Sequence, residues 1–192
     1  QIEELSRVDP SLGVMVAVHV GLCSMTIALS GSKEQKEKYL PKLATGEYLG
    51  AYSLSEAGSG TDAAAMVAKA NEEDEFYVLN GEKMWVTNGT TADLFVLFAK
   101  VTDHPDYGKK SHGGVTCFII EKGFEGFEIG KKEDKLGIRS SDTCTLILND
   151  CKVPKANVLG DVGKGFPIAM NALDNSRIGI AAQGLGIAQG AY

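Results

Sequence analysis

The spacing of hydrophobic residues changes twice along the chain. Residues 1–47 and 161–192 repeat apolar positions at helical spacing, whereas residues 48–160 contain short apolar runs separated by turn residues, as strands do. Strands do not alternate with helices, as a parallel sheet would require. The pattern predicts an α+β protein with an N-terminal helical domain, a middle domain built on an antiparallel β-sheet, and the start of a C-terminal helical domain.

The longest apolar run, residues 14–29, lies in a helix predicted to extend from Pro10 to about residue 30. This run is shorter than the ~18–20 residues that a membrane span needs, so we expect a buried core helix and no membrane span. His19 lies within the run, where a hydrogen-bonded core or interface histidine is expected rather than a ligand. A capping-box pattern predicts a further helix over residues 33–43.

The strongest local signal in the middle domain is Asn80-Gly81, a pair typical of type I′ turns because both central residues of such turns need positive φ. We therefore expect residues 76–79 and 82–87 to form an antiparallel hairpin. Residues 66–70 are expected to be a strand or a short helix. The remaining strands are expected at residues 48–54, 94–101, 115–121, 127–129 and 143–148.

Charge and cysteine usage narrow the class of protein. The chain has 19 Lys+Arg against 25 Asp+Glu, a net charge of −6, which argues against a nucleic-acid binder. Its 4 cysteines have no C-x-x-C spacing and it has only 3 histidines, so we expect neither a zinc site nor a disulfide framework. We expect reduced, partly buried thiols in an intracellular protein, since the first residues show no targeting pattern.

Gly58, Gly60 and Ala63 match the spacing of a dinucleotide-binding fingerprint. Such a site also needs a helix and a second parallel strand, which the following residues do not predict. The segment is therefore either a plain glycine-rich turn or a loop whose exposed N–H groups meet an anion or a flat ring.

Trp85 is the only tryptophan. On a strand, Trp85 and Thr87 are expected on one face and Met84 and Val86 on the other. Trp85 is then either a core residue or a stacking surface beside a hydroxyl donor, as a flat heterocyclic cofactor would need.

Taken together, YSLSEAGSGTD (52–62) and NGEKMWVTN (80–88) resemble the acyl-CoA dehydrogenase family. The resemblance continues through residues 2–9, 31–47, 130–143, 153–160, 163–166 and 173–189, and so covers nearly the whole chain. It is closest to the short-chain and short/branched-chain members, including butyryl-CoA dehydrogenases. In this chain, residues 1–47 would then belong to the N-terminal helical domain and residues 48–160 would form the β domain. Residues 161–192 would form the first helix of the C-terminal helical domain.

The resemblance implies an FAD enzyme that oxidises short-chain acyl-CoA to trans-2-enoyl-CoA in fatty-acid or branched-chain amino-acid breakdown. It further implies electron transfer to an electron-transferring flavoprotein, a homotetramer in the full-length form, and a bacterial cytoplasmic or mitochondrial matrix location.

By the same resemblance, acyl-CoA should contact Thr61, Phe166, Asp174 and Arg177. The expected FAD-binding residues are Tyr52, Leu54, Ser55, Gly60, Thr61, Trp85, Val86 and Thr87.

No residue of this chain matches the family's catalytic glutamate. That glutamate is expected beyond Tyr192, or, as in some members, on the last helix at the position of Ser176. The chain is therefore interpreted as part of a longer dehydrogenase. Two alternatives stay open: a non-catalytic fragment that binds FAD and acyl-CoA, and a truncated interaction module that binds no flavin.

Overall fold

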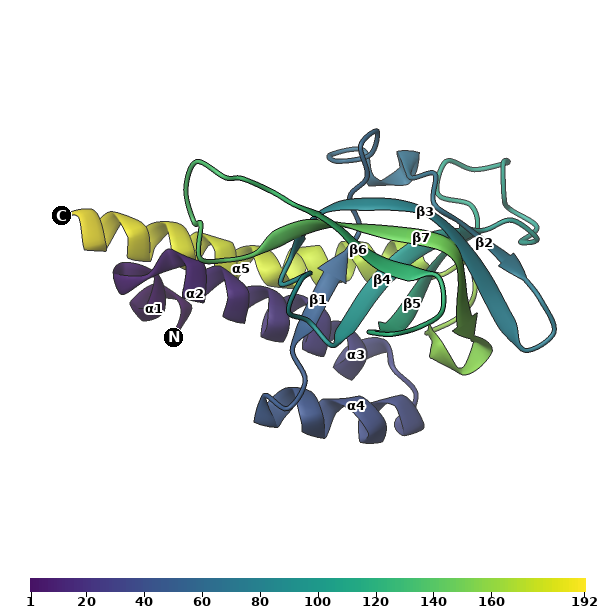
Figure 1. The fold of residues 1–192 in the computed structure, drawn as a ribbon, viewed down its shortest axis with the longest axis horizontal. Coiled ribbons are helices and arrows are strands. Elements are labelled where there is room, and N and C mark those ends of the chain that lie inside the picture. Colours follow the sequence, from purple (N-terminus) through teal and green to yellow (C-terminus); the bar gives the residue numbers. More distant parts are fainter.

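The computed structural model describes residues 1–192 and combines a group of helices with one curved sheet (Figure 1). The predicted α+β class and the order of its three parts are confirmed. The helices are α1 (Ile2–Val8), α2 (Pro10–Val16), the π-helical η1 (Ala17–Ser24), α3 (Met25–Ser30), α4 (Lys33–Thr45) and α5 (Gly165–Ala191), with 3₁₀ turns η2 (Ala63–Ala65) and η3 (Lys155–Asn157). The strands are β1 (Gly50–Ser53), β2 (Lys69–Glu72), β3 (Phe76–Thr87), β4 (Leu94–Val101), β5 (Val115–Glu121), β6 (Phe127–Lys132), β7 (Thr143–Pro154) and β8 (Val158–Leu159).

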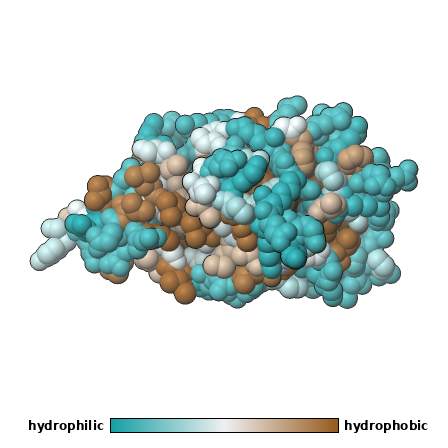
Figure 2. Space-filling model, turned by 90° about the horizontal axis from the view of Figure 1, so that it is seen from below, coloured by the Kyte–Doolittle hydropathy of each residue, from teal (hydrophilic) through white to brown (hydrophobic).

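Segments α2, η1 and α3 form one continuous helix of 21 residues, and the most apolar 18-residue stretch within it has a mean hydropathy of 2.1. The helix is longer than the apolar run of residues 14–29 within it. Its length and composition alone would therefore allow it to cross a membrane. Its packing favours the core-helix interpretation for one face only, where Cys23 and Ile27 are fully buried. Val20 and Leu29 are exposed, and Figure 2 shows hydrophobic residues gathered on the half of the molecule where Figure 1 places the helices.

His19 joins this helix to its neighbours, as the sequence predicts for a satisfied core histidine. The Gly50 N–H donates to His19 Nδ1 at 2.9 Å, so the proton lies on Nε2, which donates to the Leu43 carbonyl at 3.0 Å. The ring thereby connects η1 to the end of α4 and the start of β1. This contact fixes where β1 enters the candidate site.

The sheet has the order β6-β7-β3-β2-β4-β5-β8, and β1 also pairs with β4. Most neighbours are antiparallel, as expected. The prediction of a purely antiparallel sheet is wrong at one place, because β1 and β2 both run parallel to β4 and share one of its edges. Parallel pairing is possible here since long connections separate these strands in the sequence.

Alternate residues of β4 enter two separate cores. Leu94, Val96 and Phe98 face the helices, where they pack with Ile27 of α3 and residues of α5. Phe95, Leu97, Ala99 and Val101 face the concave inside of the sheet, which β3 and β7 close. The sheet therefore encloses one core and shares the other with the helices, as Figure 1 shows for β3 and β7 lying over β4 and β5.

The predicted hairpin at Asn80-Gly81 is wrong, because β3 passes through both residues as one strand. Leu79 pairs with Cys151 and Gly81 with Leu148, with a shift in register between them. The Asn80 side chain bonds to Asp150 of β7 in both directions, donating to its carboxylate at 3.0 Å and accepting its N–H at 2.9 Å. The extra residue of this β-bulge belongs to β7, where Asn149 and Asp150 together lie opposite Asn80. Continuous pairing with a long partner strand offers β3 more hydrogen bonds than a local turn would.

Gly81→Ala tests this bulge. Gly81 has φ 144°, and a Cβ there would lie 2.9 Å from Cα and Cβ of Ala68. We expect the free energy of unfolding to fall by ~1–3 kcal/mol, measured by urea denaturation followed by circular dichroism. Gly184→Ala in α5 is the control, since its Cβ would meet no atom within 4 Å and should not destabilise. Equal stability of the two variants would contradict the bulge.

The cysteines give a second test. All four are buried and free, and burial raises the pKa of Cys23 and of Cys151 to about 12 and that of Cys144 to about 11. Since the thiolate is the reactive form, the folded chain at pH 8 should not react with Ellman's reagent. Unfolding in guanidinium should release four reactive thiols. Rapid reaction of any thiol in the folded chain would show that its surroundings are open.

Candidate functional site

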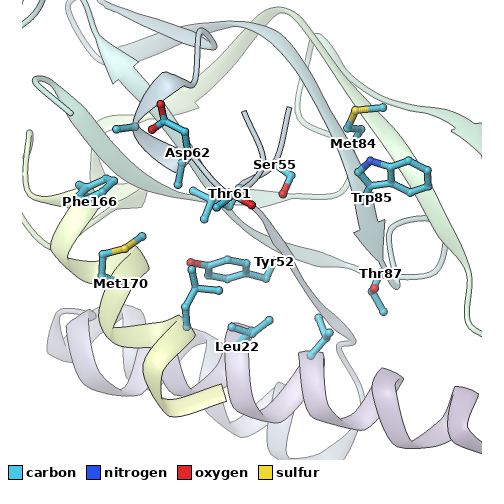
Figure 3. A pocket seen from close by; sticks show the side chains of 16 residues that line it. Leu22, Tyr52, Ser55, Thr61, Asp62, Met84, Trp85, Thr87, Phe166 and Met170 are labelled. Carbon is cyan, nitrogen blue, oxygen red and sulfur yellow. The ribbon is translucent and has the colours of Figure 1, made fainter. Parts of the chain in front are cut away.

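A pocket of about 480 Å³ lies where the sheet meets the helices (Figure 3). Four parts of the chain form it: η1, β1 with the loop that follows it, the end of β3, and the first turns of α5. The lining residues are Val18, Leu22, Tyr52, Leu54, Ser55, Gly60, Thr61, Asp62, Ala63, Ala64, Met84, Trp85, Thr87, Phe166, Met170 and Leu173.

The glycine-rich segment forms a polar rim of the pocket. A small bridge holds its base, with reciprocal backbone hydrogen bonds of 2.9 and 3.0 Å between Glu56 and Ser59. The backbone N–H groups of Gly60 and Thr61 donate no hydrogen bond within the chain. Gly60 also has open space around it. Of the two interpretations of this loop, the arrangement favours exposed donors that can meet a polar ligand.

Trp85 is presented to the pocket by a second irregularity of β3. The register between β3 and β7 shifts between Lys83 and Val86, and Trp85 adopts φ 60°, which is rare for a bulky residue. Trp85 is 58% exposed, so the core-tryptophan interpretation is wrong. The predicted alternation also fails for Met84, which lines the pocket together with Trp85 and Thr87 because the bulge interrupts the period of two.

The opposite wall of the pocket is apolar, and Phe166 is its only member among the predicted site residues. Phe166, Met170 and Leu173 lie on one face of α5 at helical spacing, and Val18 and Leu22 lie one turn apart on η1. Periodicity could have grouped each pair or triplet. It could not show that the two faces meet, because more than 140 residues separate them in the sequence.

Tyr52 of β1 lies between the two walls. The residue is 9% exposed, and its ring packs against Phe98 with centroids 5.3 Å apart. Its hydroxyl has no hydrogen-bond partner, although it is buried, and burial raises its pKa well above the ordinary value. The hydroxyl end lies on the side of α5 in Figure 3. A buried hydroxyl without a hydrogen-bond partner destabilises the fold unless a ligand supplies that partner. The part of the pocket next to Tyr52 therefore suits a ligand with a polar atom.

Most of the predicted site residues meet in this pocket. The members that line it are Tyr52, Leu54, Ser55, Gly60, Thr61, Trp85, Thr87 and Phe166. They come from β1 and its loop, β3 and α5. Asp62, which is not among the predicted site residues, joins them at the rim.

Val86, Asp174 and Arg177 do not line the pocket. The Val86 side chain is buried on the other face of β3, where it packs in the core inside the sheet. Asp174 and Arg177 lie on the exposed side of α5 and pair with each other at 2.9 Å. Ser176 is outside the pocket as well, and its hydroxyl donates to the Leu173 carbonyl of the same helix.

The pocket therefore combines an exposed indole, a hydroxyl and free backbone donors on one side with an apolar wall on the other. Such a site can hold a flat polar ring against the indole and an apolar chain beside it.

The models of two family domains match the chain. The N-terminal domain of acyl-CoA dehydrogenases matches residues 1–47 and the middle domain matches residues 51–151. A short-chain specific acyl-CoA dehydrogenase of Clostridium acetobutylicum is 52% identical over 191 residues, which is 100% of this chain and 49% of that protein. The chain belongs to the acyl-CoA dehydrogenase family.

Two solved structures agree with this assignment. Butyryl-CoA dehydrogenase from Megasphaera elsdenii superposes with a TM-score of 0.94 at 46% identity, covering 99% of this chain and 49% of that one. An acyl-CoA dehydrogenase from Bacillus anthracis, solved in complex with FAD, gives a TM-score of 0.88 at 42% identity, covering 96% of this chain and 31% of that one. The chain thus spans about half the length of the curated relative described above.

The exposure of Trp85 leads to a stability prediction. A buried tryptophan replaced by alanine costs ~3–5 kcal/mol, but for Trp85→Ala we expect a loss below ~1.5 kcal/mol. Trp85→Gly should be at least as stable as Trp85→Ala, since glycine tolerates φ 60°. Urea unfolding followed by circular dichroism measures both. Phe98→Ala, at a fully buried position, is the matched control and should cost the full ~3–5 kcal/mol. A Trp85→Ala loss of that size would contradict the exposed placement.

Proposed function

We propose that this chain forms the FAD- and acyl-CoA-binding part of a short-chain acyl-CoA dehydrogenase, which oxidises acyl-CoA thioesters to trans-2-enoyl-CoA. The observation that carries the proposal is the pocket wall formed by Trp85 and Thr87 opposite an apolar helix face. This wall presents a large exposed aromatic surface beside a hydroxyl. Family membership and the names of the relatives support the same reaction class.

The residues present fit FAD. The Trp85 indole offers a surface for the flavin ring, the Thr87 hydroxyl can donate to a ring nitrogen, and the free N–H groups of Gly60 and Thr61 can meet polar ring atoms. The Tyr52 hydroxyl lacks a partner that a ligand could provide. When bound, FAD supplies the acceptor for the hydride that leaves the acyl β carbon.

The apolar wall fits a short acyl chain. Leu22, Phe166 and Met170 exclude water from the space next to the flavin wall, which strengthens electrostatic interactions with a polarised thioester. The Thr61 hydroxyl lies at the rim, where it can contact the thioester portion. Asp174 and Arg177 stand on the helical turn after Leu173, and we propose that they contact the CoA portion outside the pocket.

The reaction also needs a base within hydrogen-bond reach of the acyl α carbon. Asp62 is the only carboxylate that lines the pocket, and it is exposed at the rim. Ser176 is a hydroxyl directed at its own helix. We therefore propose that the base of the complete enzyme is a glutamate outside these 192 residues, and that this chain alone binds both ligands without turning them over.

The family resemblance extends the proposal to the complete enzyme. It would pass electrons to an electron-transferring flavoprotein, assemble as a homotetramer, and work in the bacterial cytoplasm or the mitochondrial matrix. Its acyl preference would be for short chains, since the named relatives include a short-chain specific enzyme and a butyryl-CoA dehydrogenase.

Flavin titration tests the binding part. Adding FAD to the chain should quench Trp85 fluorescence, because a flavin stacked on the only indole accepts its excitation. Leu136→Ala, at a fully exposed position outside the pocket, should bind FAD as the unaltered chain does. For Trp85→Ala, retention of FAD on gel filtration should be reduced. Absence of flavin binding by the unaltered chain would favour the interaction-module alternative and refute the proposal.

Anaerobic addition of butyryl-CoA tests the catalytic part. The FAD-loaded chain should keep its oxidised absorption band, since no positioned base removes the α proton. A chain that contains the complete enzyme's C-terminal half should lose this band. Rapid bleaching by the 192-residue chain would show that a base is present here, with Asp62 as the first candidate to replace by asparagine.

A further inference from the structure

One buried ion pair lies directly under the glycine-rich loop. Lys83 Nζ is 2.7 Å from Glu56 Oε1, and the two side chains are 0% and 4% exposed. No other ion pair in the structure is buried to this extent; Lys152 and Glu125, for example, are 46% and 75% exposed. The pair does not line the pocket.

Every polar contact of this pair leads to the loop. Lys83 Nζ also donates to the Leu54 carbonyl at 3.1 Å, where the loop begins. The two Glu56 oxygens accept the N–H groups of Val67 and Ala68 at 2.6 and 3.1 Å, where the loop ends. The pair therefore connects the two ends of residues 54–68, and the pocket-lining members of this segment lie between them.

The same pair also connects the loop to the indole wall. Lys83 stands two residues before Trp85, at the start of the bulge in β3. The neighbouring Met84 N–H donates to the Ser55 carbonyl at 3.0 Å. A shift of the Lys83 side chain would thus move the loop and the strained Trp85 relative to each other.

Stability alone does not account for such a pair. Removing two charges from water costs several kcal/mol per ion, and apolar residues of similar size often stabilise as well or better. Burial lowers the pKa of Lys83, which reflects this cost. What apolar side chains could not supply is the set of directed hydrogen bonds to Leu54, Val67 and Ala68.

We propose that Glu56 and Lys83 are positioning residues, which hold residues 54–68 and the Trp85 wall in the relative arrangement that receives the flavin. This inference rests on the proposed function for the identity of the ligand. The holding of the loop is independent of it and can be measured without flavin.

Glu56→Asp is the decisive variant. It keeps the charge next to Lys83 but shortens the side chain by one methylene, so the carboxylate cannot reach both backbone amides. We expect amide hydrogen exchange at Val67 and Ala68 to become at least about tenfold faster, while exchange in β4 remains unchanged. FAD affinity should fall about tenfold, equivalent to ~1.4 kcal/mol.

Two further variants keep the test decisive. If Glu56→Asp does not fold, the double variant Glu56→Gln/Lys83→Met removes both charges and leaves none buried without a partner, and the same changes are expected. Lys152→Met, which breaks the exposed pair with Glu125, is the control and should alter neither exchange nor FAD affinity.

Exchange at Val67 and Ala68 within twofold of the unaltered chain would overturn the inference, and so would faster exchange with unchanged FAD affinity. Failure of the unaltered chain to bind FAD would instead refute the proposed function. In that case the exchange rates would still decide whether the pair holds the loop.

Discussion

The double-sided burial of β4 is the constraint on which the rest of the structure depends. Seven of its eight residues are buried, and successive side chains enter different cores. One edge of the strand pairs with β5, while the other is divided between β1 and β2. Because β1 and β2 both align on this edge, the segment that joins them must leave the sheet and return. That segment is the glycine-rich loop, so the burial of one strand determines where the pocket lies.

Several departures from regular structure lie at or beside this pocket. Trp85 and Asn88 have positive φ, and β3 changes register next to Trp85. The buried ion pair of Glu56 and Lys83 lies between this strand and the glycine-rich loop. The surrounding scaffold supports these features: Asn88 donates to carbonyls of Met15 and Gly50, and the Asp142 carboxylate accepts from Thr90. Strain that persists only because the surroundings enforce it is typical of functional sites.

The two walls of the pocket have different physical origins. The polar wall is built by backbone geometry at the ends of strands, where bulges and free N–H groups occur. The apolar wall is built by helix packing, because α5 lies against η1 and α1 (Figure 1). Small residues allow this approach: a Cβ at Gly186 would overlap the backbone of α1. A ligand with a flat polar ring and an apolar chain matches this division.

The sequence by itself determined the element types, the three-part order and the family, because periodicity and the two motifs are local properties. Through those motifs it also identified seven of the 16 residues that line the pocket. It did not reveal that Asn80-Gly81 lies inside a strand, because the choice between a turn and a bulge depends on hydrogen bonds offered by β7, some 70 residues away. Nor did it reveal that Met84 faces the pocket, or that Leu22 and Met170 meet. Only the tertiary structure decided these points, since bulges reset the side-chain alternation and contacts between distant helices are invisible to local spacing.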